Sequence, residues 1–185
     1  VTLDITAAPT PTIGLSATSL SFSAVQGGSN PANKTVTISN TGSGTLTWTA
    51  SESSSWLSIS PASGTGTGTL AISVNTSGMT AGSYSTTISI AASGATNTPQ
   101  TISVSLTLSA PPTIGTSPSS FSFTATQGGV NPSTQPLTIS NTGGGSLSWT
   151  VTDNAAWLSV SPASGTGTGS ATLSVNTAGM TAGTY

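Results

Sequence analysis

WLSISPASGTGTGTLAISV, at residues 56–74, returns as WLSVSPASGTGTGSATLSV at residues 157–175. In both copies, two runs of alternating apolar and hydroxyl residues flank a glycine-rich connection that follows a proline. Alternation with a period of two is typical of a β-strand that buries one face. Proline and glycine favour a turn between such runs. The stretch therefore predicts two strands and a tight connection, made twice.

The glycines of this connection do not match a phosphate-binding loop. Such a loop lies between a strand and the N-terminus of a helix, whereas a second strand follows here. The spacing of Gly64, Gly66 and Gly68 matches neither GxGxxG nor the Gly-Lys-Ser/Thr ending of a P-loop. We interpret these glycines as turn residues that supply positive φ angles, with Pro61 ending the strand before them.

The repetition extends outward from this stretch over most of the chain, with a constant offset of 101 residues. Residues 13–84 align with residues 114–185 without a gap, and 44 of the 72 aligned positions are identical. Repeats of solenoid proteins span only about 20 to 50 residues, so the longer unit here is a whole domain. The sequence predicts a tandem array of domains.

Within one repeat, the alternating pattern occurs in seven short runs separated by Gly, Pro, Asn and Ser. Their apolar positions fall within residues 20–24, 36–38, 46–50, 57–59, 70–74, 84–90 and 102–108. Such a series predicts an all-β fold, an immunoglobulin-like β-sandwich of about seven strands, with a small barrel as the alternative.

Tyr84 supports the sandwich through its place in the pattern. It opens the sixth run shortly after a glycine, and Tyr185 has the same place in the second repeat. In immunoglobulin-like domains a tyrosine here forms a tyrosine corner, in which the hydroxyl bonds to the preceding loop. We therefore expect a structural role for both tyrosines.

The pattern divides the chain into three parts. Residues 1–12 are the last strand of a preceding repeat and a linker, because VTLDIT aligns with residues 102–107. Residues 13–109 form a complete sandwich, and residues 110–185 form a second one that lacks its last two strands. Prolines make the connection APPTI, at residues 110–114, a short and semi-rigid joint.

The ends of the chain leave two hypotheses open. In the first, the sequence is a window on a longer array. In the second, the incomplete sandwich is finished by a strand from the next molecule, as in β-strand addition, which builds fibres. Val1, Leu3 and Ile5 would then be the donated apolar residues. One donated strand replaces only one of the two missing strands.

Charge is almost absent, since only Asp4, Lys34, Glu52 and Asp153 carry it. Nucleic-acid binding needs clustered basic residues, so nucleic acid is excluded as a partner. No apolar run approaches the roughly 20 residues of a membrane-spanning helix. Serine and threonine make up 73 of the 185 residues, so hydroxyl groups keep the surface soluble. This composition favours an extracellular protein.

The groups that catalysis needs are nearly missing, because the chain has no His, no Cys, one Lys and three carboxylates. A Ser-Lys arrangement is not repeated, since Gln135 replaces Lys34 in the second repeat. Glycoside cleavage takes two acids, and each repeat holds one, Glu52 or Asp153. Calcium commonly takes several carboxylates. The sequence predicts no enzyme, no cofactor and no metal site.

Tryptophans are the better candidates for binding. Trp48 shares the face of the apolar residues of its run and is expected in the core. Trp56 and Trp157 lie on the opposite face if their strands are regular, with Glu52 and Asp153 shortly before them. In each repeat, the tryptophan and the acid before it form a candidate sugar-binding platform. In the alternative, a bend tucks each ring over the sandwich edge, and the acids are turn residues.

Two asparagines are candidates for N-glycosylation. Asn33-Lys34-Thr35 and Asn75-Thr76-Ser77 both match the Asn-x-Ser/Thr pattern. Neither pattern is reproduced in the second repeat.

The order of the motifs SLSFSAVQGG, TISNTGSGTLTWTA, WLSISPASGTGTG and AGSYSTTISI resembles the BACON domain and its relatives. These are immunoglobulin-like modules that occur in tandem in secreted and surface proteins of bacteria. The resemblance covers residues 15–108 and 116–185. It implies an extracellular bacterial origin, a non-catalytic module, and a role in binding carbohydrate or mucin. It supplies no agreed set of binding residues.

Two functions remain open. The first is a non-enzymatic structural repeat of an extracellular bacterial surface or fibre protein, whose sandwiches form a filament or stalk with other copies of the chain. The second is an adhesive module that binds carbohydrate or mucin, with glycans as its partners.

Overall fold

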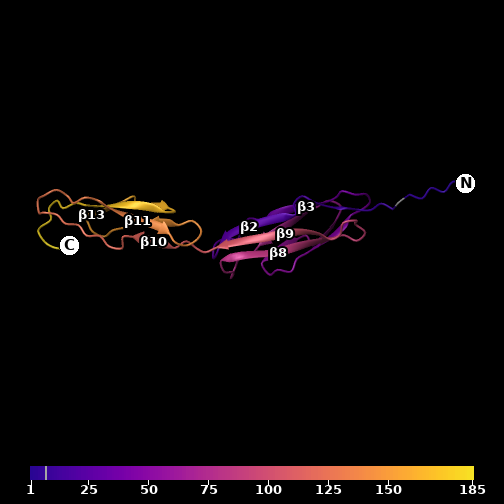
Figure 1. Ribbon diagram of the computed structural model, residues 1–185, viewed down its shortest axis with the longest axis horizontal. Helices are drawn as coiled ribbons and strands as arrows, with labels where there is room; N and C mark the ends of the chain where they lie inside the picture. Colours follow the sequence, from indigo (N-terminus) through magenta and orange to yellow (C-terminus); the bar gives the residue numbers. More distant parts are fainter. Residues whose placement is uncertain (7) are drawn as a thin grey trace. The chain divides into compact units, whose positions relative to one another are not determined.

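The computed structural model describes residues 1–6 and 8–185, and all regular elements among them are β-strands. The chain divides into two compact units, Val1–Ala110 and Pro111–Tyr185 (Figure 1). The prediction of an all-β chain with two repeated sandwich halves is confirmed. Its strands lie in separate open sheets, so the alternative of a small closed barrel is wrong.

The first unit is a sandwich of two sheets. The four-stranded sheet has the order β1 (Ile13–Leu15), β3 (Lys34–Asn40), β7 (Gly68–Val74) and β5 (Leu57–Ser60). The five-stranded sheet has the order β2 (Ser19–Val25), β9 (Gln100–Ser109), β8 (Gly82–Ala91), β4 (Thr47–Ser51) and β6 (Ser63–Thr65). All seven predicted runs are strands. β1 and β6 escaped the sequence analysis because three residues are too few to show an alternating pattern.

The two sheets enclose one hydrophobic core. Its buried side chains come from alternate positions of both sheets, such as Ile38 and Ile72 in one and Ile88 and Leu106 in the other. Alternation places every second residue of a strand on the inner face. The runs that alternate in the sequence therefore supply the core.

Trp48 lies at the centre of this packing, with 1% of its surface exposed, as the sequence predicted. Its indole Nε1 donates a hydrogen bond to the carbonyl of Gly66, at 3.2 Å. Gly64 and Gly68 lie so close to the ring that a side chain at either position would collide with it. Among the three turn glycines, only Gly66 has a positive φ, of 68°. The interpretation of the other two as positive-φ residues is wrong, because they leave room for the indole.

β9 lies between β2 and β8 in the five-stranded sheet. It pairs with β2 in parallel and with β8 in antiparallel register, and Figure 1 shows the three strands side by side. Leu106 of β9 lies opposite Phe22 in β2 and opposite Tyr84 in β8. Residues from near the two ends of the repeat thus become neighbours.

The second unit repeats part of this arrangement. One sheet has the order β10 (Ile114–Ser117), β11 (Gln135–Asn141), β15 (Gly169–Val175) and β13 (Leu158–Ser161). A two-stranded sheet pairs β12 (Ser148–Thr150) with β14 (Ser164–Thr166). The four-stranded order matches that of β1, β3, β7 and β5.

Residues 120–126 of the second unit align with β2 but form no strand. In the first unit the only strand partner of β2 is β9, and residues 111–185 include no counterpart of β9. The alternating sequence at this position is therefore insufficient to form a strand without a neighbour to pair with.

The first six residues form no strand either. Val1, Leu3 and Ile5 are all strongly exposed, with Leu3 at 81%. Their role as donated apolar residues stays a prediction.

Gly64→Ala should destabilise the first unit, because the new methyl group would collide with the buried Trp48 ring. Overpacking of this kind costs about 1 to 3 kcal/mol. Urea unfolding followed by tryptophan fluorescence measures the loss. The control is Thr65→Ala, an exposed neighbour in β6 whose replacement should change stability by less than about 0.5 kcal/mol. Equal midpoints for the two variants would contradict the packing role of Gly64.

Candidate functional site

Tyr84 fixes the loop that leads into β8. Its hydroxyl donates a hydrogen bond to the carbonyl of Thr80, at 2.8 Å, and Tyr185 makes the same bond to Thr181, at 2.8 Å. The predicted tyrosine corner is thereby confirmed in both units. Both tyrosine hydroxyls are used in this structural contact.

Trp56 is half-buried beside this corner. The residue lies in a turn directly before β5, and its side chain packs against the hydrophobic core. Its ring lies 6.5 Å from the ring of Tyr84, centroid to centroid, at an angle of 59°. The bend that the sequence analysis weighed as the alternative is present. A part of the ring stays accessible, so ligand binding by Trp56 stays a prediction.

Glu52 and Asp153 both form hydrogen bonds within their own turns. The Glu52 carboxylate accepts bonds from the backbone nitrogen of Ser54, at 2.7 Å, and from its hydroxyl, at 3.1 Å. Asp153 accepts one from the backbone nitrogen of Ala155, at 3.3 Å. Acidic and amide side chains commonly stabilise turns in this way. These contacts match the turn role, and ligand binding by the two acids stays a prediction.

Trp157 contributes to a groove in the second unit. The groove has a volume of about 500 Å³. Its large apolar lining residues are Phe123, Trp157, Val175, Met180 and Tyr185. In the first unit Phe22, which aligns with Phe123, is 4% exposed, whereas Phe123 is half-buried. β9 lies beside Phe22 there, so the groove is the place that β9 occupies in the first unit.

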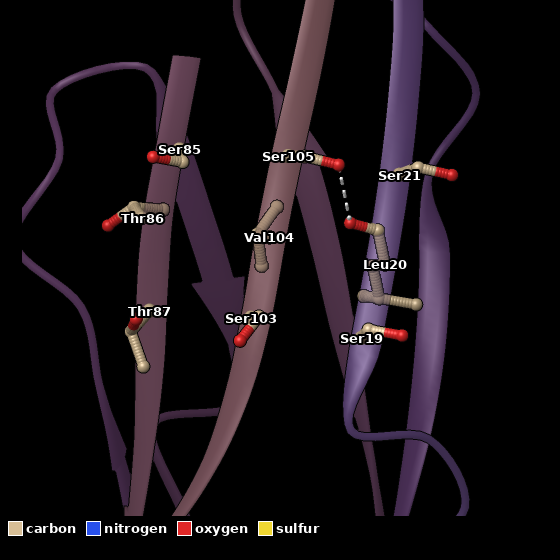
Figure 2. A pocket seen from close by; sticks show the side chains of 9 residues that line it. All are labelled: Ser19, Leu20, Ser21, Ser85, Thr86, Thr87, Ser103, Val104 and Ser105. Atoms are coloured by element: carbon tan, nitrogen blue, oxygen red, sulfur yellow. Dashed lines mark hydrogen bonds between the residues drawn. The ribbon is translucent and has the colours of Figure 1, made fainter.

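Hydroxyl groups gather on the outer face of the first unit, over β2, β9 and β8. We call the set Ser19, Ser21, Ser85, Thr87, Ser103 and Ser105 the hydroxyl face. The strand register aligns them in two rows, Ser21-Ser105-Ser85 and Ser19-Ser103-Thr87. They line a shallow depression of about 560 Å³ (Figure 2). The alternating sequence pattern predicts that these side chains face outward. The pairing of β9 with both β2 and β8 brings them together on one face.

The chemistry available on the hydroxyl face is neutral hydrogen bonding. Each hydroxyl can donate one bond and accept two, and the face has no charged or aromatic side chain. Figure 2 shows one hydroxyl already engaged, that of Ser105 with the carbonyl of Leu20, at 3.4 Å. Such a surface suits a neutral, hydroxyl-rich ligand or ordered water.

The free edge of β2 is covered by a long polar side chain. The Ser103 nitrogen donates to the Thr18 carbonyl, and the Ser105 hydroxyl donates to the Leu20 carbonyl. Successive carbonyls of a strand point to opposite sides, so the even-numbered carbonyls of β2 face β9 and the Ser21 carbonyl faces the free edge. Lys34 Nζ donates to this Ser21 carbonyl, at 2.7 Å. The ammonium group also lies 5.3 Å from the centre of the Phe22 ring.

Gln135 makes the equivalent contact in the second unit. Its Nε2 donates to the carbonyl of Ser122, also at 2.7 Å. Exposed strand edges invite pairing with a neighbouring chain, and a side chain that bonds to the edge carbonyl obstructs the approach of such a chain. The replacement of lysine by glutamine therefore keeps the contact while losing the charge.

The two glycosylation candidates, Asn33 and Asn75, are both exposed. Asn75 accepts a hydrogen bond from the backbone nitrogen of Ser77, at 3.1 Å. Glycosylation at either position stays a prediction.

Metal-binding side chains do not cluster among the described residues, where no group of three His, Cys, Asp or Glu side chains lies together. In the same residues, no helix is long and apolar enough to cross a membrane.

Comparison with known families gives one match. A family model described as the viral BACON domain matches residues 12–106 and again residues 113–185. The two matches follow the two units. No curated protein sequence matches the chain.

Several solved structures share a similar arrangement of strands. A xyloglucanase from Bacteroides ovatus is 23% identical over 53% of this chain, with a TM-score of 0.42. This chain spans only 19% of that enzyme. A protein of unknown function from Porphyromonas gingivalis is 14% identical over 89% of this chain and 83% of its own, with a TM-score of 0.43. A PapD-like domain of human CEP192 is 15% identical over 58% of this chain and 91% of its own, with a TM-score of 0.41. At these values the similarities carry no argument about function.

Lys34→Met should increase self-association, because it removes the hydrogen bond that covers the Ser21 carbonyl at the edge of β2. Sedimentation velocity over a range of concentrations measures this as a shift to larger species. Lys34→Gln is the matched control and should behave as the parent, since Gln135 makes the same bond in the second unit. If the Met variant sediments like the parent, the hydrogen bond from Lys34 to the Ser21 carbonyl does not limit self-association.

Proposed function

The chain belongs to the family of viral BACON domains, and on this premise we propose that it is a non-catalytic β-sandwich module, repeated as the structural part of an extracellular fibre or stalk. The membership confirms the resemblance found in the sequence. The description of the family as viral supports a virus particle as the carrier of the fibre, beside the bacterial surface expected from the sequence.

The observation that carries this proposal is the composition of the packed core. Among the described residues, the buried side chains are hydrophobic except for that of Thr76, which is 3% exposed. The hydroxyl of Thr76 bonds to Asn30, at 2.9 Å. Catalytic sites need buried or clustered titratable groups, and such groups are scarce throughout this sequence. A module with this interior is suited to carrying load or spacing other parts.

The lack of charge also suits a tandem array. Neighbouring modules with a net charge of −2 over 185 residues repel one another weakly at any ionic strength. Hydroxyl groups keep the surface hydrated without that repulsion. The spacing of the modules should then be insensitive to salt.

Electron microscopy of the native material that contains this chain tests the proposal. We expect fibres or stalks along which a domain-sized unit repeats, unchanged between low and high salt because few charges are present. Isolated compact particles with no repeated unit would contradict it.

The groove of the second unit supports a finer proposal, that a β-strand with the pattern of β9 closes it. In the first unit β9 buries Ile102, Val104 and Leu106 between the sheets. Residues 1–6 carry the same alternating pattern in alignment and are exposed. Residues 183–185 align with the first residues of β8, so an inserted strand would have a neighbour on both sides. A second copy of the chain is the proposed donor.

Deletion of residues 1–6 tests the donor. If a second copy supplies the strand, the 185-residue chain should form head-to-tail oligomers in light scattering, and the deletion should abolish them. A peptide of residues 100–109 should compete, and the same peptide with Val104 and Leu106 replaced by Asp should not. Oligomers that persist after the deletion would overturn the second-copy donor. A monomeric chain that binds the peptide would instead assign the strand to a later segment of a longer protein.

The alternative function, carbohydrate or mucin binding, is favoured by the hydroxyl face and by the accessible part of Trp56. Neutral hydrogen-bonding groups and aromatic rings are the groups with which proteins bind neutral polar ligands such as sugars. The two features come from different parts of the first unit.

Glycan-array binding separates the two functions. An adhesive module should bind at least one glycan, and Trp56→Ala should lower that binding at least tenfold, because stacking on the ring is lost. Trp56→Phe is the control, since it keeps an aromatic ring packed against the core. A structural repeat should bind no glycan, and Trp56→Ala should then change only its stability.

A further inference from the structure

We infer that the turn after the second long strand of each repeat is a clamp that binds the connection preceding that repeat, so that one free residue joins consecutive repeats. The turn is Asn40–Gly44 in the first unit and Asn141–Gly145 in the second. The segment ISNTG occurs at residues 38–42 and again at residues 139–143, and in both repeats another glycine follows two positions later. The clamp is seen in each unit by itself, and only its consequence for an array rests on the proposed function.

In the first unit the clamp holds residues 10–12 through backbone hydrogen bonds. The Ser43 nitrogen donates to the Thr10 carbonyl, at 3.0 Å, and the Thr41 nitrogen donates to the Thr12 carbonyl, at 2.9 Å. The Thr12 nitrogen donates to Asn40 Oδ1, at 3.0 Å. These bonds continue the pairing of β1 with β3 beyond the strand, so the connection is bound like an edge strand.

Asn40 also stabilises the turn that it belongs to. Its Oδ1 accepts a second bond from the Gly42 nitrogen, at 3.0 Å, and its Nδ2 donates to the Gly44 carbonyl, at 2.9 Å. The side chain thus binds the turn and the connection at once. An asparagine has the donor and the acceptor that this double role needs, whereas an aspartate has only acceptors.

The second unit repeats these bonds on the connection between the two repeats. The Gly144 nitrogen donates to the Pro111 carbonyl, at 3.1 Å, and the Thr142 nitrogen donates to the Thr113 carbonyl, at 2.8 Å. The Thr113 nitrogen donates to Asn141 Oδ1, at 3.0 Å. Pro111–Thr113 is therefore bound to the unit that follows it.

A glycine in the middle of the clamp lets the connection approach. A side chain at Gly143 would collide with the Pro111 carbonyl and the Thr113 nitrogen, and one at Gly42 would collide with Thr10 and Thr12. Neither glycine has a positive φ. Close approach of the connection, and not backbone conformation, is the reason for a glycine at both positions.

The preceding side of the connection is bound to the first unit. Ser109 is the last residue of β9 and lies opposite Val25, and its carbonyl accepts a bond from the Gln26 nitrogen, at 2.9 Å. Pro111 is the first residue bound by the clamp. Ala110 alone lies between these anchors, and the proline rings after it fix two φ angles. The joint therefore has few free dihedral angles, and the inference predicts that consecutive repeats sample a narrow range of orientations.

In the first unit, Thr96 and Asn97 also bind the connection, in addition to the clamp. Asn97 bonds to both the nitrogen and the carbonyl of Ile13, each at 2.9 Å, and the Thr96 nitrogen bonds to the Pro11 carbonyl, at 3.1 Å. Ile13 is 4% exposed there, whereas the aligned Ile114 is 53% exposed. Residues 111–185 include no counterpart of Thr96 and Asn97, so the Asn-Thr-Gly turn alone holds Pro111–Thr113.

Spin labels on the two units test the inference. The chain has no cysteine, so Ser58→Cys and Ser159→Cys, at exposed equivalent positions of β5 and β13, give one label in each unit. Pulsed dipolar spectroscopy then measures the distribution of distances between the labels. We expect a narrow distribution for the parent and one at least twice as wide for Gly143→Ala, which releases Pro111–Thr113.

Gly42→Ala is the matched control. It makes the same substitution in the same turn but releases only residues before the first repeat, so the distribution should stay narrow. Two residues, Gly-Ser, inserted after Ala110 form a second variant that leaves the clamp intact and should widen the distribution. This variant keeps the test decisive if Gly143→Ala fails to fold.

The inference is overturned if the parent distribution is as wide as that of the insertion variant, or if a folded Gly143→Ala variant stays narrow. A wide distribution for Gly42→Ala would also overturn it, because the turn would then act through the stability of its unit. None of these results bears on whether the native material forms fibres, so the two proposals fail separately.

Discussion

The pairing of β9 with β2 on one side and β8 on the other is the interaction on which the sandwich depends. It joins residues from near both ends of the repeat and buries the apolar face of β9 between the sheets. Residues 111–185 of the second unit include no counterpart of this strand. Residues 120–126 have the alternation of β2 but no partner, and they form no strand. Strand formation here is a consequence of pairing and not of local preference.

The same strand organises the candidate binding surfaces. Because β9 lies between β2 and β8, the outward hydroxyl groups of three strands align into one neutral face. In residues 111–185, which include no counterpart of β9, Phe123 and Trp157 line a groove. The two surfaces differ in chemistry, because the hydroxyl face has no aromatic side chain, whereas large apolar and aromatic side chains line the groove together with hydroxyl groups. The first suits a hydrated contact, and the second suits a strand that buries apolar side chains.

Short polar contacts adapt this fold to a repeated array. The Asn-Thr-Gly turn binds the incoming connection, and a long side chain at position 34 or 135 covers the edge of the neighbouring strand. Both contacts involve backbone carbonyls and neither requires a charged group, since Gln135 makes in the second unit the bond that Lys34 makes in the first. In the proposed array, the first contact would limit bending between repeats and the second would oppose lateral association.

The sequence by itself determined the all-β class, the period of the repeat, seven of the nine strands of the first unit and the burial of Trp48, because these depend on patterns within a few residues or on identity between copies. It also indicated the structural role of Tyr84. Only the tertiary structure decided that β2 pairs in parallel with β9, that Gly64 and Gly68 leave room for the Trp48 ring, and that the ring of Trp56 is half-buried. It likewise decided that Asn40 and Asn141 hold the connections. The physical reason is the same in each case, since these contacts join residues far apart in the chain, and no local pattern specifies which distant residue will be the partner.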